Sequence, residues 1–253
     1  MDKKIIRNKH SHLLEEKIFN YSLQDVKEPQ LYRDIFDYKH VPKIIFNNRQ
    51  VPMNMPEEIW ITDTTFRDGQ QSTSPFTVNQ IVELYKLMHR LGGKKGIIRQ
   101  SEFFIYSEKD RSAARACMEL GYDFPEVTSW IRANKKDFQL VKEMGMKETG
   151  ILVSCSDYHI FKKMNLTRAQ AVEKYLGTVK DALDAGIKPR CHFEDITRAD
   201  FYGFVVPFAS ELMKLSRESG IPIKIRACDT MGFGVNFVGA ALPRSVPGII
   251  YGL

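Results

Sequence analysis

The chain has 253 residues, 43% hydrophobic and 27% charged, which fits a globular protein with one large α/β domain or two small ones. It has no apolar run of about eighteen residues, and its basic start lacks an apolar core, which excludes a membrane span and a secretory signal. The net charge is +6, but the lysines and arginines form no block and no basic helix, which argues against nucleic-acid binding.

Residues 1–57 are predicted to be an N-terminal extension made of a helix and a hairpin. The segment SHLLEEKIFNYSL, residues 11–23, has apolar side chains at helical spacing. Residues 42–55 hold two short apolar runs around the turn-prone pair Asn47 and Asn48, which predicts a β-hairpin. We expect subunit contacts in this extension if the intact protein is a homodimer.

From residue 58 to residue 253, short strand-like runs alternate with longer amphipathic runs. Strands are predicted at residues 59–62, 96–99, 126–130, 148–154, 188–193 and 223–228. Helices are predicted at residues 77–93, 107–122, 134–146, 167–186 and 203–220, each ending at or near a glycine. Pro207 is expected to start or kink the last of these helices.

Six such repeats predict a parallel sheet with helices outside it, either an open doubly wound sheet or a (β/α)8 TIM barrel. No GxGxxG follows the first strand, which argues against dinucleotide binding. A barrel has eight units, and this chain supplies about six. Ser245 and Pro247 begin a further helix about two turns before the last residue. We therefore expect an incomplete TIM-barrel domain in a truncated chain.

The four cysteines lie far apart and form no CxxC pair. This spacing argues against a disulfide framework and against a structural zinc site. We expect reduced thiols and a cytoplasmic protein.

Polar side chains cluster at five of the six predicted strand ends. Each fits a turn, a helix cap or an ion pair when taken alone, but strand ends of such a barrel converge on one mouth. The first strand is followed by Arg67 and Asp68. The later strands contribute Gln100, Glu102, Arg132, Asn134, His192, Glu194, Asp195, Arg198, Asp229 and Thr230.

Carboxylates beside a histidine suggest a divalent metal, Mg²⁺, Mn²⁺ or Zn²⁺. Such an ion can hold a 2-oxo acid and polarise its carbonyl. An adjacent arginine can stabilise the oxyanion that forms. We therefore expect Asp68 to bind the metal and Arg67 to neutralise the oxygen.

The segment DTTFRDGQQ, residues 63–71, resembles the DTTLRDGEQ signature of a metal-dependent TIM-barrel family. That family includes 2-isopropylmalate, homocitrate and citramalate synthases and hydroxymethylglutaryl-CoA lyase. The segments SWIRANKKD, SCSDYHI, HFEDITRAD and DTMGFG fall where the family has similar ones. The resemblance covers residue 58 to the end.

The resemblance implies roles for particular residues. Arg67 matches an arginine that binds the substrate oxygen, and Asp68 matches a metal ligand. Catalytic roles are expected for Arg67 and Glu194. The residues expected to line the substrate pocket are Arg67, Glu102, Arg190, His192, Glu194 and Thr230. His192 stands where relatives often have a small polar residue.

The sequence departs from the family in two places. Gln70 replaces the usual glutamate of the signature. The other family metal ligands form a His-x-His pair after a seventh strand, and this chain ends before that strand. His10 and His12 have the right spacing but lie in the extension, where nothing resembles a strand end.

The resemblance implies a Claisen-type acyltransferase that condenses acetyl-CoA, its co-substrate, with a 2-oxo acid, as in leucine biosynthesis. One alternative is a carbon–carbon lyase resembling hydroxymethylglutaryl-CoA lyase. The other is an inactive fragment that lacks the histidine ligands. Partners would be small molecules, with no nucleic acid and no membrane.

Overall fold

The computed structural model describes residues 5–7, 9, 14–16, 44–46, 49–51, 56–237, 240 and 242–253. The chain divides into two compact units, Met1–Pro42 and Lys43–Leu253. In the first unit, β1 (Ile5–Arg7) pairs antiparallel with β2 (Leu14–Glu16). The helix predicted from residue 11 is therefore wrong at residues 14–16. A helix of about thirteen residues is marginal unless one face is packed, so strand pairing can displace it.

The second unit begins with the predicted hairpin, which is confirmed. Strand β3 (Ile44–Phe46) pairs antiparallel with β4 (Arg49–Val51), with Phe46 in register with Arg49. The expected boundary at residue 57 lies inside this second unit. The histidines at positions 10 and 12 lie outside the described residues.

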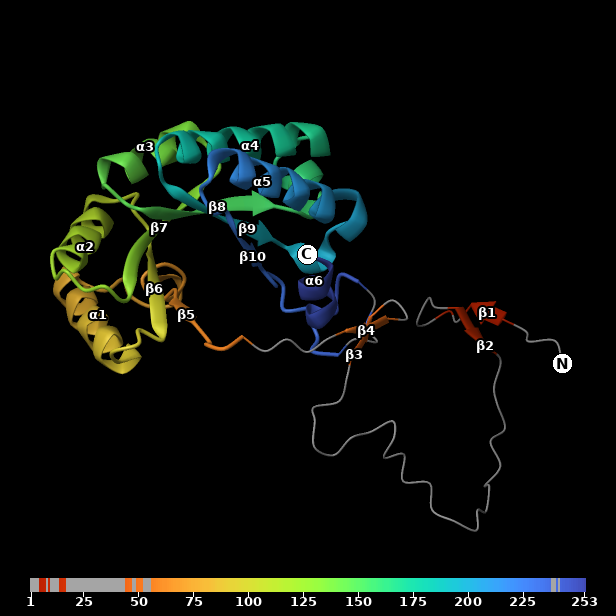
Figure 1. Cartoon of the computed structure of the whole chain (residues 1–253), viewed down its shortest axis with the longest axis horizontal. Helices are drawn as coiled ribbons and strands as arrows, with labels where there is room; N and C mark the ends of the chain where they lie inside the picture. The colour runs from red at the N-terminus through yellow and green to blue at the C-terminus, as the bar shows by residue number, and fades with distance from the viewer. Residues whose placement is uncertain are drawn as a thin grey trace, which may run out of the picture. The chain divides into compact units, whose positions relative to one another are not determined.

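Six parallel strands form the main sheet, in the order β10-β9-β8-β7-β6-β5. Each strand pairs with the next along the chain, so the sheet grows in one direction and curls (Figure 1). The strands are β5 (Ile61–Asp63), β6 (Ile98–Phe103), β7 (Glu126–Arg132), β8 (Glu148–Ser154), β9 (Lys188–Glu194) and β10 (Lys224–Ala227). This curled sheet is the expected partial TIM barrel.

Helices α1 (Val78–Gly92), α2 (Glu108–Met118), α3 (Lys135–Glu143), α4 (Arg168–Asp184) and α5 (Val206–Ser219) cover the convex side of the sheet (Figure 1). The last helix, α6 (Val246–Gly252), lies apart from this layer. Thr77, Ser107 and Thr167 close capping boxes, and Pro207 lies in the first turn of α5, as predicted. Shorter turns are η1 (Gly69–Gln71), η2 (Tyr158–Lys163), η3 (Ile196–Arg198) and η4 (Phe201–Val205).

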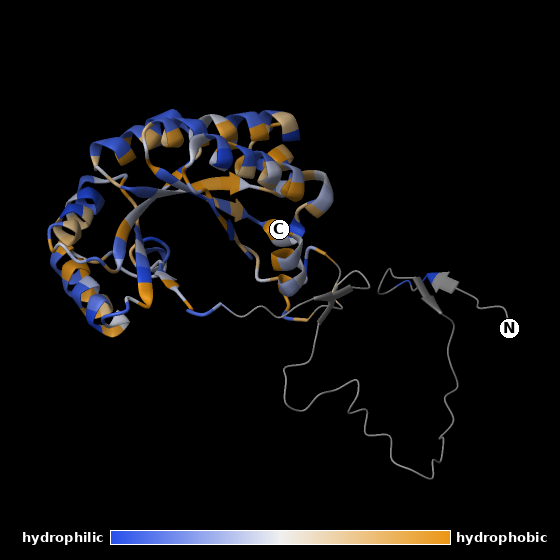
Figure 2. Cartoon of the chain, viewed as in Figure 1, coloured by the Kyte–Doolittle hydropathy of each residue, from blue (hydrophilic) through white to orange (hydrophobic). Residues whose placement is uncertain are grey.

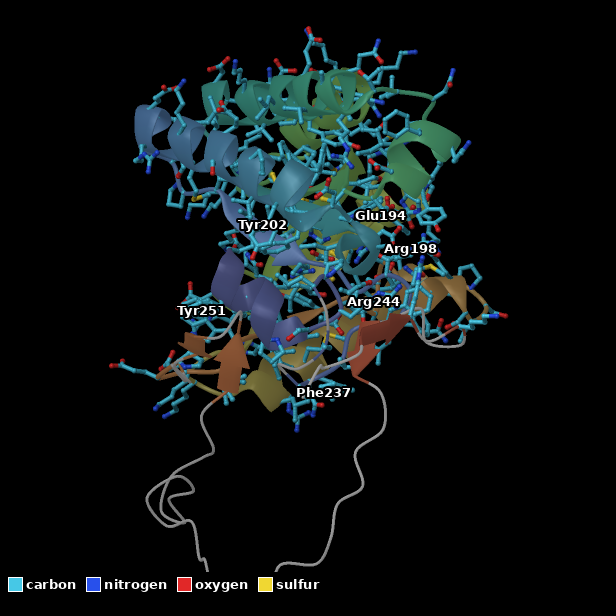
Figure 3. All side chains as sticks on the ribbon, turned by 90° about the vertical axis from the view of Figure 1, so that its right-hand side faces the viewer. Glu194, Arg198, Tyr202, Phe237, Arg244 and Tyr251 are labelled. Atoms are coloured by element: carbon cyan, nitrogen blue, oxygen red, sulfur yellow. The ribbon has the colours of Figure 1, made fainter. Side chains whose placement is uncertain are left out.

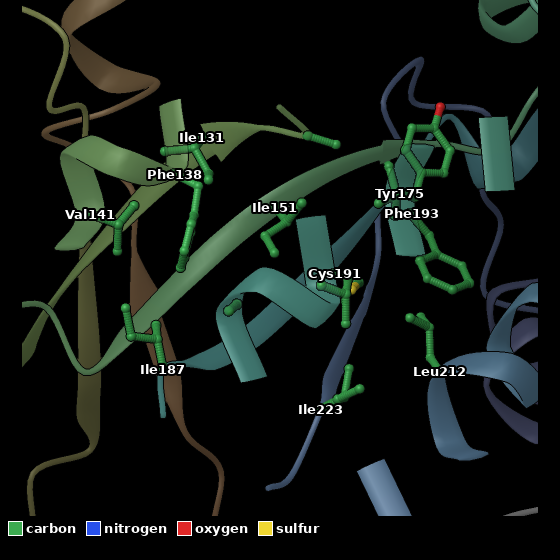
Figure 4. Close-up of a cluster of buried hydrophobic side chains, with 14 of the residues drawn as sticks. Ile131, Phe138, Val141, Ile151, Tyr175, Ile187, Cys191, Phe193, Leu212 and Ile223 are labelled. Carbon is green, nitrogen blue, oxygen red and sulfur yellow. The ribbon is translucent and has the colours of Figure 1, made fainter. Parts of the chain in front are cut away.

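The hydrophobic core lies between the sheet and these helices. Strand side chains alternate between two faces, and the outward set packs under the helices. Figure 4 shows Ile131, Ile151 and Phe193 of the strands near Val141 of α3 and Leu212 of α5. The helices turn hydrophilic residues outward (Figure 2). No helix among the described residues is long and apolar enough to cross a membrane.

Candidate active site on the concave face

The inward set of strand side chains is polar. Arg190 of β9 lies at its centre with 3% exposure. One of its terminal nitrogens lies 2.6 Å from Glu102 Oε1, and the other donates to Glu148 and Gln100. Lys224 reaches the second oxygen of Glu148 at 2.6 Å. The interior of a TIM barrel is more usually filled by branched apolar side chains. The charged side chains on this face are therefore unusual for a barrel interior and mark it as a candidate site.

Three arginines, which we call the arginine cluster, share the carboxylate of Glu102. They are Arg67 (2.9 Å), Arg190 (2.6 Å) and Arg226 (2.9 Å). Burial by itself raises the pKa of Glu102, but the hydrogen bond with His192 and the arginine charges outweigh burial and hold the pKa at about 2. Arg190 and Arg67 also pair with Glu148 and Asp68, so among the described residues Arg226 is the arginine of the cluster whose carboxylate partner is Glu102 alone.

His192 is buried beside Glu102, with its Nε2 atom 3.3 Å from Glu102 Oε1. Burial lowers the pKa of His192 to about 4, so the ring is neutral near pH 7. The neighbouring strand makes room for it with a glycine. A Cβ at Gly150 would lie 2.8 Å from His192 Nε2 and 2.9 Å from Trp130 Cδ1.

Arg67 lies beyond the carboxyl end of β5, above the ring of Trp130 at 5.0 Å. Its Nη2 atom is 2.7 Å from Asp68 Oδ2. The Asp68 side chain is about half exposed, whereas Arg67 is 12% exposed. Trp130 Nε1 is buried and has no hydrogen-bond partner among the described residues. Arg67 and Asp68 thus lie together, as expected.

Gln70, the first departure from the family signature, forms hydrogen bonds within the loop that contains it. Its amide nitrogen donates to the Phe66 carbonyl at 2.8 Å, and its oxygen accepts from the Phe76 backbone at 3.1 Å. Lys109 lies 3.5 Å from the same oxygen. A neutral amide serves both contacts, because it donates and accepts.

A second polar group follows β9. Asp195 is fully buried in a left-handed conformation, with φ of 61°. Its carboxylate accepts from Arg198 at 2.6 Å and from Ser156 at 2.5 Å. Burial raises the pKa of Asp195, but these donors outweigh burial and lower it. The Asp195 backbone N–H donates to Thr230 Oγ1 at 2.8 Å, which fixes Thr230 next to this loop.

Glu194 is the last residue of β9, and Figure 3 labels it together with Arg198 of the turn that follows. Ser154 donates to its Oε2 atom, and His159 Nδ1 lies 2.9 Å from the same oxygen. Burial raises the pKa of the partly buried Cys228 thiol, while the charges of Arg226 and Arg67 lower it and those of Glu102 and Glu194 raise it.

Two residues singled out from the sequence have structural roles. Arg132 forms an ion pair with Asp137 at 2.8 Å, and Asn134 caps α3. Sequence reasoning missed Trp130, His159 and Arg226. Trp130 and Arg226 could have been found from the alternation of β7 and β10, which places them on the same face as Thr128 and Lys224.

The described residues do not form a complete metal site. No group of three or more His, Cys, Asp or Glu side chains in that part of the chain is placed to hold an ion. Asp68 supplies one carboxylate, already paired with Arg67. The metal role of Asp68 stays a prediction, and no chemical step is assigned to a metal.

The fold and site define a partial (β/α)8 barrel with an arginine cluster on its inner face. The family model described as HMGL-like matches residues 58–243. The chain belongs to this family. The resemblance of residues 63–71 is therefore confirmed.

Curated relatives and a solved structure support the assignment to this family and fold. The chain is 62% identical over 235 residues to citrate (Re)-synthase of Clostridium kluyveri, covering 93% of this chain and 52% of the relative. It is 58% identical to citrate (Re)-synthase of Syntrophus aciditrophicus, covering 98% and 39%. Hydroxymethylglutaryl-CoA lyase of Pseudomonas aeruginosa has a TM-score of 0.51 and 20% identity, covering 72% of this chain and 61% of that one, which supports the fold.

The chain thus spans about half the length, or less, of these two curated relatives. Identity to 2-isopropylmalate synthase 2 of Caldanaerobacter subterraneus is 30%, covering 69% of this chain and 43% of the relative. The expected link to leucine biosynthesis is not supported, because relatives named as citrate synthases are about twice as similar. The short signature that suggested that link is common to the whole family.

Proposed function

We propose that the intact protein condenses acetyl-CoA with a 2-oxo acid. The observation that carries this proposal is the arginine cluster, in which three guanidinium groups share Glu102. Burial lowers the pKa of Arg226, and the charges of Arg190 and Arg67 lower it further, although Glu102 opposes them. An anionic substrate would pair with Arg226, which shares its one carboxylate partner among the described residues with two other arginines.

The particular 2-oxo acid is a finer proposal. Two relatives at 62% and 58% identity are named citrate synthases. Removing the acetyl group from citrate leaves oxaloacetate, a 2-oxo acid with a second carboxylate. Several arginines on one face suit a dianion better than a monoanion. We therefore propose oxaloacetate as the acceptor.

Three side chains would share the chemistry. Arg67, the arginine nearest Asp68, would stabilise the oxyanion on the attacked carbonyl. Glu194 would take part in proton transfer, since its carboxylate is 15% exposed and so accessible from the mouth. Glu102 and Arg190 are buried against each other, so they would hold the cluster in shape while Arg67 and Arg226 contact the substrate.

The test is thiol release from acetyl-CoA by the intact protein, with a panel of 2-oxo acids. We expect release with oxaloacetate and less with 2-oxoisovalerate. Breakage of a carbon–carbon bond in a 3-hydroxyacyl-CoA, giving acetyl-CoA and a carbonyl product with no free thiol, would favour the lyase alternative. No turnover by a folded protein, with or without added Mn²⁺, would favour the inactive-fragment alternative.

Location and assembly are also proposals. The cysteines Cys117, Cys155, Cys191 and Cys228 are free, which suits the reducing cytoplasm that we propose. A homodimer of the intact protein remains our expectation, to be checked by light scattering.

A further inference from the structure

The two oxygens of the Glu194 carboxylate have different surroundings. Oε2 accepts a hydrogen bond from Ser154 and lies 2.9 Å from His159 Nδ1. Oε1 has a looser contact, 3.7 Å from the Nζ atom of Lys163, whose side chain is 59% exposed. One oxygen is thus held by the protein, and the other is available at the rim.

His159 reaches Glu194 from the turn η2, which is a π-helix. Such turns are rare and often occur at functional sites. The His159 backbone N–H donates to the Ser156 carbonyl at 3.0 Å. The other ring nitrogen, Nε2, lies 3.9 Å from Asp195 Oδ2, beyond a direct hydrogen bond. The contact between His159 and Glu194 is therefore made through Nδ1.

We propose that His159 is a positioning residue for Glu194. Its Nδ1–H donates to Oε2, and together with Ser154 it leaves Oε1 as the oxygen that exchanges a proton with substrate. In the condensation, a proton passes from the acetyl methyl carbon to Oε1, and the C–H electron pair remains on the acetyl group as an enolate. The proposal rests on the proposed function, in which Glu194 takes part in proton transfer.

The removal of this donor has a defined consequence for the reaction. Without the His159 donor, Oε2 keeps only the hydrogen bond from Ser154, so Oε1 is no longer held toward the substrate. Turnover should then fall while KM changes little. The other charged or titratable groups near this carboxylate are Lys163, Asp195, Cys155, Tyr175 and Cys228, and they are the same in every variant below.

Two substitutions separate positioning from simple packing. In His159→Asn the amide nitrogen stands near the position of Nδ1 and can still donate to Glu194. In His159→Gln the amide stands near Nε2, so the donor to Glu194 is lost. We expect His159→Gln to lower kcat by roughly tenfold or more, and His159→Asn by about threefold or less. His89→Gln is the control, because His89 Nδ1 contacts an oxygen away from the site, the Phe124 carbonyl at 2.6 Å.

The deciding readout is the NMR signal of the His159 ring, labelled with nitrogen-15, in the intact protein. We expect a proton on Nδ1 that is shifted downfield by its hydrogen bond to Glu194, with that shift lost in Glu194→Ala while the His89 ring signal is unchanged. A His159 ring without a proton on Nδ1, or an Nδ1–H signal that is the same in wild type and Glu194→Ala, would overturn the proposal. This measurement does not need turnover, so an inactive protein would refute the proposed function without deciding the role of His159.

Discussion

Replacing Glu102 by glutamine tests the electrostatics of the arginine cluster. The change keeps the shape of the side chain but removes the charge that three arginines share. The folded-state pKa of about 2 lies well below the usual value of 4.5. This difference corresponds to a stabilisation on the order of 3 kcal/mol near pH 7.

The pH dependence of this loss of stability follows from the direction of the pKa shift of Glu102. A lowered folded pKa stabilises the protein above the unfolded pKa, and the stabilisation disappears as pH falls through the folded pKa. The difference in unfolding free energy between wild type and Glu102→Gln should therefore shrink to roughly half by about pH 3. Other carboxylates titrate in both proteins, so the difference isolates Glu102.

The assay is urea unfolding followed by circular dichroism, at several pH values between neutral and about 3. Glu83→Gln is the matched control, since Glu83 is 69% exposed and pairs with Lys86 on α1. It should cost less than about 1 kcal/mol. Equal stability of Glu102→Gln and wild type near pH 7, or a difference that does not depend on pH, would refute the reasoning.

Three further predictions concern packing, thiols and catalysis. Gly150→Ala should destabilise the fold by about 1–3 kcal/mol, because the added Cβ would meet His192 and Trp130. Gly177→Ala should stabilise the fold by up to about 1 kcal/mol, because Gly177 lies on α4 with open space around its Cβ position. The midpoints of urea unfolding check both changes in stability. A thiol reagent should modify at most Cys228 in the folded chain, and all four cysteines after denaturation. The other three, Cys117, Cys155 and Cys191, are buried, and burial raises the pKa of Cys117 and Cys191 to about 12. Fast reaction of two thiols in the folded chain would contradict this prediction. Arg67→Ala should lower kcat by roughly 10²–10³ if Arg67 stabilises an oxyanion, and an unchanged kcat in steady-state assays would remove that role.

The fold could be predicted from the sequence because each strand–helix repeat contains its own apolar strand, helix-capping residue and terminal glycine. Thr77, Ser107 and Thr167 begin helices as capping residues, and the strand at residues 148–154 was predicted to the residue. The second strand was placed too early, since β6 runs to Phe103. The prediction ended that strand at its first polar side chain. Gln100 and Glu102 are polar because they face the charged interior, so polarity there does not mark a strand end.

The site was predictable only in part. Arg67 and Asp68 were singled out because they are adjacent after the first strand; the structure shows them as an ion pair, and their roles toward substrate and metal stay predictions. The sharing of Glu102 by Arg190 and Arg226 depends on contacts across 88 and 124 residues, which no local pattern encodes. His159 was missed for a similar reason, because its partner Glu194 lies 35 residues away.

The fate of the acetyl methyl carbon tests the central proposal most directly. The intact protein would be incubated with acetyl-CoA labelled with carbon-13 at the methyl position and with oxaloacetate, and the products identified by NMR. We predict that the label appears in a methylene carbon of citrate, joined by a new carbon–carbon bond. Label that remains in acetyl-CoA, or that appears only in free acetate, would contradict the proposed condensation.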